Sequence, residues 1–448
     1  MTKPTDLVVT DGGGDLGAKL GETPRSYSAV YRCAVFALTF GLMLSDYMSR
    51  QVINAIFPFL KAEWTLSDAQ LGALASVVAL VVGVMTFPVS LLADRWGRVR
   101  SATAMALVWG VATIGCGLAG GFASMLVARA FVGLGEAGYG SAGGAILTHV
   151  FPRRLHSTIM GAFMAAALFG SVLGVILGGV LARSLGWQLA FMVIGGAGLV
   201  LAVAFPLVVK ELPMASTGGA PALSLQSVIR EPFRFRTVNC TYVASGLLMF
   251  IQGSIVAWAP SYLNRYYAMD PARAAVGAGV LVLVAGVGMT LGGIVADRLV
   301  AVRHSNRLNI VAAYALASGA TLLVAFAISP GPLQVCMIAL GLLLGAGFAG
   351  PSGAVVADVT NPAIRATVFA TLTLANNLIG LAPGPFVTGV LADAIGLDAA
   401  MRLIPLTSIL AAVLYTAAAR SYHRDRRHYA TTQTDDSNDR SVQFAPGR

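Results

Sequence analysis

Long apolar runs alternate with short polar stretches along most of the chain. The hydrocarbon core of a bilayer is about 30 Å thick, and a helix needs about 20 apolar residues to cross it. Because runs of that length recur, the pattern predicts twelve membrane-spanning helices, near residues 33–58, 70–92, 102–121, 123–148, 158–182, 188–209, 237–262, 275–296, 308–329, 333–357, 367–392 and 400–419.

The polar stretches divide the chain into five predicted parts. The long polar stretch between the sixth and seventh runs contains the prolines and small residues of a linker. The first residues are polar and rich in glycine and lack the apolar core of a secretory signal, so they are expected to be disordered, as is the charged end of the chain. The parts are an N-terminal tail (1–30), an N-terminal six-helix half (31–209), a linker (210–236), a C-terminal six-helix half (237–420) and a C-terminal tail (421–448).

Composition supports a membrane protein and excludes other classes. Hydrophobic residues make up 56% of the chain and charged residues 11%, whereas soluble domains carry about a quarter charged residues. The net charge of +10 lies mostly between the apolar runs and not on one basic face, so no nucleic-acid partner is expected. The sequence lacks a His-Glu-x-x-His pair, a Gly-x-Ser-x-Gly elbow and a glycine-rich phosphate loop, which argues against an enzyme. No cofactor or metal is expected, because the cysteines have no ligand spacing; they are Cys33, Cys116, Cys240 and Cys336.

Lysine and arginine gather in the loops on one side of the predicted spans. By the positive-inside rule this side faces the cytoplasm, and both tails lie on it. We therefore expect a multi-pass protein of a bacterial-type inner membrane with both termini in the cytoplasm. The basic set on this side is Arg95, Arg98, Arg100, Arg153, Arg154, Lys210, Arg230, Arg234, Arg236, Arg298, Arg303, Arg307 and Arg365, against Lys61, Arg183, Arg265, Arg273 and Arg402 on the other.

The two halves repeat one another in sequence. Residues 179–186 read GVLARSLG and residues 389–396 read GVLADAIG, an offset of 210 positions. The triplet Ala-Asp-Arg ends at Arg95 and again at Arg298, an offset of 203. Both pairs fall at equivalent connections of the two halves. Parallel repeats of this kind place a cavity between the halves at the midplane and allow alternating access by rocking.

The loop at 91–100 (LLADRWGRVR) resembles the signature between the second and third spans of the major facilitator superfamily. The resemblance covers both halves and implies an all-α fold of twelve transmembrane helices in two six-helix parallel repeats. It departs from the family pattern at Ser90, near the opening glycine, and the second copy lacks the trailing Gly-Arg pair. Glycine allows a tight turn, and an acid at a helix end can latch one conformer. The expected gating loop is Asp94, Arg95, Gly97 and Arg98, with Asp297 and Arg298 in the second half.

Three further segments resemble two branches of this superfamily, the organic anion–cation symporters and the Spinster-like proteins. They are 46–60 in the first span, Arg129 with 133–137 in the fourth, and 377–389 in the eleventh. In those branches an aspartate often precedes the first-span arginine, whereas here Ser49 does, and Asp46 is one turn earlier.

Four ionisable residues lie within predicted spans: Asp46 and Arg50 in the first, and Arg129 and Glu136 in the fourth. A charge at bilayer depth is costly, so each is a functional candidate. Asp46 and Arg50 are four positions apart and share a helix face, and Arg129 and Glu136 share a face about 10 Å apart. We expect Glu136 and Asp46 to couple protons and Arg50 or Arg129 to contact an anion, since a guanidinium binds carboxylates bidentately. A purely structural charge network stays the alternative.

The second half offers polar and aromatic candidates in place of charges. Amides and hydroxyls within spans bind either a substrate or a neighbouring helix. The remaining expected substrate contacts are Tyr47 in the first half and Tyr242, Gln252, Asn376 and Asn377 in the second. Trp258 and Tyr262, near a helix end, are expected in an interfacial belt.

The function predicted from the sequence is secondary active transport by alternating access. The leading hypothesis is proton-coupled uptake of a small organic anion, such as an aromatic carboxylate or a sugar acid, by a chain that works as a monomer in the lipid bilayer. The alternative is proton-coupled export of an amphipathic lipid or drug. An anion importer needs an unpaired arginine at its site, whereas an amphiphile carrier tolerates a mostly apolar cavity.

Overall fold

The computed structural model describes residues 27–211, 233–303, 307–360 and 364–443, and these contain helices and no strand. Eleven helical stretches within them are long and apolar enough to cross a membrane. A twelfth crossing is divided between α4 (Phe122–Glu136) and α5 (Tyr139–Val150), each shorter than a full span. The predicted fold class, twelve helices in two parallel six-helix repeats, is confirmed.

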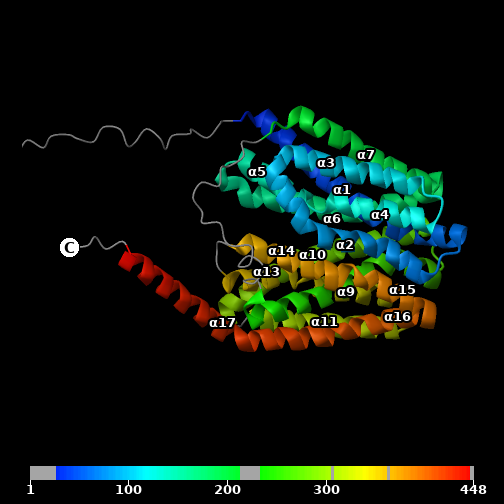
Figure 1. Ribbon diagram of the computed structural model, residues 1–448. Helices are drawn as coiled ribbons and strands as arrows, with labels where there is room; N and C mark the ends of the chain where they lie inside the picture. Colours follow the sequence, from blue (N-terminus) through cyan, green and yellow to red (C-terminus); the bar gives the residue numbers. More distant parts are fainter. Residues whose placement is uncertain (1–26, 212–232, 304–306, 361–363, 444–448) are drawn as a thin grey trace, which may run out of the picture.

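The N-terminal half lies beside the C-terminal half, and the helices of both run roughly parallel (Figure 1). The other N-terminal elements are α1 (Ala29–Trp64), α2 (Asp68–Trp96), α3 (Arg98–Gly117), the short η1 (Arg153–Leu155), α6 (His156–Leu185) and α7 (Trp187–Val208). The C-terminal elements are α9 (Arg236–Tyr266), α10 (Pro271–Arg303), α11 (Arg307–Ala327), α12 (Pro332–Ala346), α13 (Ala349–Asp358), α14 (Arg365–Ala375), η4 (Asn376–Leu381), α15 (Pro383–Ile395), α16 (Leu397–Leu403), η5 (Ile404–Leu406) and α17 (Thr407–Gln443).

The structure repeats at the offset of 210 found in the sequence. The break between α4 and α5 recurs between α12 and α13, at positions 136–139 and 346–349. The turns before α7 and α16 use Gly186 and Gly396, whose φ angles are +92° and +85°, a region that favours glycine. The sequence pattern predicted one continuous span at each break, because short interruptions leave the apolar run intact.

The halves are joined mainly at one end of the molecule. We call the end with the loop at 95–100 the arginine-rich end and the other the opposite end. Helix α2 packs along α15, α6 along α10, and α1 against α9. By contrast α5 and α13, at the arginine-rich end, pack mainly on helices of their own halves. Among described residues, the polar contacts between the halves run from mid-membrane to the opposite end.

Two predictions differ from the structure. Helix α17 continues beyond residue 420, through the segment for which the sequence predicts a disordered tail; Asp425 there accepts hydrogen bonds from the backbone and side chain of Thr237, at 2.9 and 2.7 Å. The expected belt position of Trp258 and Tyr262 is wrong, because both are buried and hydrogen-bonded. Most of the predicted N-terminal tail (1–26) and of the linker (212–232) lies outside the described residues.

Candidate functional site

A cavity of about 240 Å³ lies between the halves at mid-membrane. Its polar walls come mostly from α1, which contributes Arg50, Gln51 and Asn54 at the spacing of one helix face. Gln252 of α9 and Ser171 of α6 complete the polar part. The other lining residues are apolar or glycine: Ala75, Ala79, Met249, Gly253, Val256, Ala257, Val282, Ala285, Leu381 and Pro385.

Arg50 is the cation on this wall. Its Nη2 donates to Oδ1 of Asn377 across the two halves, at 3.3 Å. Among described residues no carboxylate pairs with Arg50 within 4 Å, so Asp46, although it shares a helix face with Arg50, forms no ion pair with it. Asn377 belongs to a π-helical turn, 376–381, a feature that often marks functional sites. The guanidinium therefore faces the cavity with a neutral partner.

Two buried carboxyl groups lie behind Arg50. Asp46 is 6% exposed and Glu136 is 8% exposed, and their carboxyl groups lie within hydrogen-bonding reach of each other. Both also interact electrostatically with Arg50. One oxygen of each, Oδ1 and Oε1, has no hydrogen-bond partner in the described structure. Glu136 is the last residue of α4, so the helix break places its side chain where α1 and α4 meet.

Arg129 is fully buried and held by backbone. Its Nε donates to the carbonyl of Leu74 at 3.2 Å, Nη1 to that of Ser49 at 2.8 Å and Nη2 to that of Arg50 at 2.9 Å. These bonds tie α4 to α1 and α2 beside the cavity. In this conformation Arg129 positions the backbone of Arg50, and its donors are not directed at the cavity.

The other predicted contacts are divided between the cavity wall and the helix interfaces. Gln252 lines the cavity and donates to the carbonyl of Leu342 at 3.4 Å. Asn376 accepts from the hydroxyl of Ser245 at 2.6 Å, and the Tyr242 hydroxyl donates to a backbone carbonyl at 3.3 Å. Tyr47 packs where α1 approaches α6.

A network at the opposite end joins the halves and was not expected from sequence. Asp68, 3% exposed, accepts two bonds of 2.7 Å from Arg265 of the other half and one of 2.5 Å from Lys61. Asp393 accepts from the first backbone N–H groups of α2, at 2.7 and 2.8 Å. A second bridge, 2.9 Å long, joins Arg183 to Asp270, and the Arg183 guanidinium holds the pKa of Asp270 below its ordinary value.

The predicted gating loop makes contacts within its own half. Arg95 and Arg98 are exposed, and the side chain of Asp94 lies outside the described part. Gly97 has a φ of +99°, and Glu211 accepts from the next N–H groups, those of Val99 and Arg100, at 3.0 Å each. In the second half Arg298 is exposed, while Arg307 bridges Asp297 and Asp358 at 3.3 Å each.

Comparisons with known proteins agree with this architecture. The family model described as Major Facilitator Superfamily matches residues 39–378. An MFS-type efflux pump of Mycolicibacterium smegmatis is 28% identical over 95% of this chain and 99% of that protein. A hexuronate transporter of Bacillus subtilis is 25% identical over 56% of this chain and 61% of that protein. A bacterial homologue of the lysosomal transporter Spinster superposes with a TM-score of 0.81 and 22% identity, over 89% of this chain and 99% of that one.

Proposed function

Because the chain belongs to the major facilitator superfamily and is therefore a membrane transporter and not an enzyme, we propose that it carries a small organic anion together with protons. The observation that carries this proposal is Arg50, a guanidinium on the cavity wall whose partner is a neutral amide. A substrate carboxylate can displace Asn377 and accept two parallel hydrogen bonds from the fork. Gln252 and Asn377 then contact the rest of the substrate.

Proton coupling is assigned to the carboxyl pair of Asp46 and Glu136. A proton between two contacting carboxyl groups relieves their mutual repulsion. When the pair is ionised, its negative charge holds Arg50; when it is protonated, Arg50 is released to the incoming anion. Arg129 has a positioning role, because it fixes the backbone that carries Arg50.

Alternating access then requires the halves to part at the opposite end. We propose that the contacts of Asp68, Arg265 and Asp393 close that end in the present conformer and that the arginine-rich end faces the cytoplasm of a bacterial-type inner membrane. Each protomer contains a complete cavity, so the monomer is the proposed working unit.

The runner-up is export of an amphipathic molecule. The apolar part of the cavity wall favours it, and the Mycolicibacterium relative is named as an efflux pump. An exporter would use the same carboxyl pair to exchange protons against cargo, so the two proposals differ in cargo chemistry and direction.

The proposal is tested by reconstituting the protein in liposomes with a proton gradient directed inward. We expect one labelled organic acid of a panel of aromatic carboxylates and sugar acids to accumulate, and Arg50→Gln and Glu136→Gln to abolish accumulation. Arg402→Gln is the matched control, because Arg402 pairs with Asp398 on the outer surface away from the cavity. If no acid accumulates and an amphiphile moves against the proton gradient, the exporter proposal replaces this one.

A further inference from the structure

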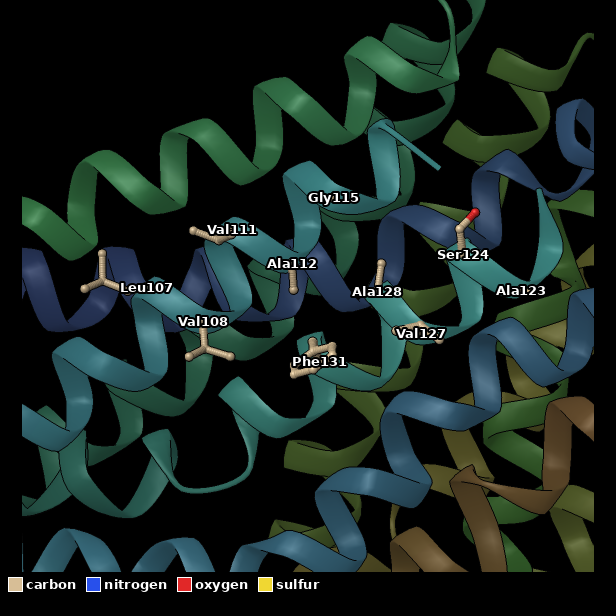
Figure 2. A pocket seen from close by; sticks show the side chains of 10 residues that line it. All are labelled: Leu107, Val108, Val111, Ala112, Gly115, Ala123, Ser124, Val127, Ala128 and Phe131. Carbon is tan, nitrogen blue, oxygen red and sulfur yellow. The ribbon is translucent and has the colours of Figure 1, made fainter. Parts of the chain in front are cut away.

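A groove of about 820 Å³ runs along the outer face of the N-terminal half between α3 and α4. Figure 2 shows its lining side chains, which come from these two helices alone. Small residues such as Ala112 and Ala128 form the floor, and Val111, Val127 and Phe131 form a rim that is 59%, 58% and 53% exposed. The groove is therefore apolar, open to the outside of the protein and within the membrane-spanning region.

The residues that form this groove differ between the two halves. At the offset of 210, Ala112 corresponds to Leu322 and Ala128 to Ile338. Both larger side chains are buried, and Leu322 Cγ lies 2.5 Å from the position that a Cβ on Gly341 would take. In the second half Leu322 packs on Gly341, the counterpart of Phe131, so a side chain covers the floor at this position, whereas in the first half Ala112 leaves it open beside Phe131.

The groove continues toward the arginine-rich end. A second hollow, of about 210 Å³, shares Val108 with the first and reaches Trp96 and Ser101. From Ser101 to Gly115 the combined groove is about 21 Å long at 1.5 Å per residue, longer than the roughly 15 Å half-thickness of a bilayer core. One acyl chain therefore fits along it.

Polar groups gather where the groove meets this end. Ser101 is 3% exposed, lines the hollow, and its hydroxyl has no partner in the described structure. Arg98 and Arg100 are exposed within one turn of it, and Arg98 lies three positions before Ser101 on the same helix face. Trp96, 57% exposed, belongs to the residue type enriched at membrane interfaces. Glu211 accepts hydrogen bonds from the N–H groups of Val99 and Arg100 in the first turn of α3. The guanidinium groups of Arg98 and Arg100 are therefore the groups that can bind an anion here.

We propose that this composite groove binds one phospholipid of the membrane, with an acyl chain along α3 and α4 and the phosphate at Arg98 and Arg100. A phosphate ester accepts charge-assisted hydrogen bonds from arginine and one from the Ser101 hydroxyl. The lipid chain covers the floor that Ala112 and Ala128 leave open. The site lies on the outer face of the protein, so it is separate from the cavity at Arg50.

The test is photolabelling of the full chain in liposomes that contain a phosphatidylglycerol with a diazirine in its acyl chain. Peptides from 107–131 are expected to be labelled well above the equivalent peptides from 317–341, the internal control. The double variant Ala112→Leu with Ala128→Ile, here called the filling variant, introduces the side chains of the second half at these two positions and should lower labelling several-fold. Arg98→Gln and Arg100→Gln, surface changes that leave the packing intact, should each lower the affinity about fivefold.

Three results would overturn the proposal. Equal labelling of the two halves would mean ordinary contact with bulk lipid. Unchanged labelling in all these variants would place the lipid elsewhere. If the filling variant, Ala112→Leu with Ala128→Ile, abolished substrate transport and left lipid labelling unchanged, the groove would bind the substrate and not a lipid. Labelling is measured without any transport, so it stays informative if the proposed cargo is wrong.

Discussion

Replacing Asp68 by asparagine is expected to open the end of the molecule that this structure closes. The carboxylate is 3% exposed and accepts both Arg265 bonds across the halves, whereas its Lys61 partner belongs to its own half. The change therefore weakens a contact that exists only while the halves meet at the opposite end.

The free-energy cost of Asp68→Asn depends on how exposed the partners of Asp68 are. Breaking a fully buried ion pair costs about 3–5 kcal/mol, and an exposed pair is worth about 0–1 kcal/mol. The side chains of Arg265 and Lys61 are 27% and 40% exposed, so this contact lies between the limits, at about 1–3 kcal/mol. The ratio of closed to open conformers at the opposite end should then fall by about 5- to 150-fold.

Spin labels at Ala62 and Ala394 measure this change by pulsed electron paramagnetic resonance in a variant without the native cysteines. Both positions are exposed at the opposite end, one in each half. Asp68→Asn and Arg265→Gln should shift the distance distribution to longer values. Asp398→Asn is the matched control, since Asp398 bonds to Tyr262 and Arg402 within one half. Distance distributions that do not change in the first two variants would refute the reasoning.

Three further predictions concern other parts of the molecule. Gly97→Ala should lower the free energy of unfolding by about 1–3 kcal/mol, read as a lower Tm in detergent, because φ is +99° and the new Cβ would lie 2.8 Å from Glu211 Oε1; an unchanged Tm contradicts this. Arg129→Gln should lower Tm and the yield of monodisperse protein, since a buried side chain loses its backbone bonds, and wild-type behaviour would argue against a positioning role. The depressed pKa of Asp270 means that its bridge to Arg183 is present above the ordinary pKa of about 4 and lost only as pH falls through the lowered value. Asp270→Asn should therefore leave the shape of the uptake profile between about pH 5 and 8 unchanged, and a shifted profile would be inconsistent with this assignment.

The fold was predictable because apolar length and loop charge carry its main signals. The span boundaries lie within a few residues of most helix ends, and the 210 offset recurs in the structure. The breaks after Glu136 and Ala346 were missed, since a two-residue interruption leaves hydropathy high. The continuation of α17 depends on Asp425 meeting Thr237, a contact 188 positions apart that local composition does not encode.

The candidate site was only partly predictable for the same reason. Ionisable residues within predicted spans gave the charged candidates, and Arg50 among them lines the cavity. The sequence did not indicate that the Arg129 guanidinium would donate to backbone carbonyls. Nor did it indicate that Asp46 would lie beside Glu136 and form no ion pair with Arg50. The loop charges at the opposite end were interpreted only for orientation, so the pairing of Asp68 with Arg265, which lie in different halves, was not predicted.

Simultaneous measurement of proton and substrate movement tests the central proposal most directly. Liposomes with an entrapped pH dye are given the labelled organic acid outside, and protein-free liposomes correct for passive entry. The wild-type protein should acidify the lumen in proportion to uptake, whereas Glu136→Gln should keep substrate exchange without proton entry. Substrate uptake with no proton entry in the wild type, or unchanged proton entry in Glu136→Gln, would contradict proton-coupled anion transport through this carboxyl pair.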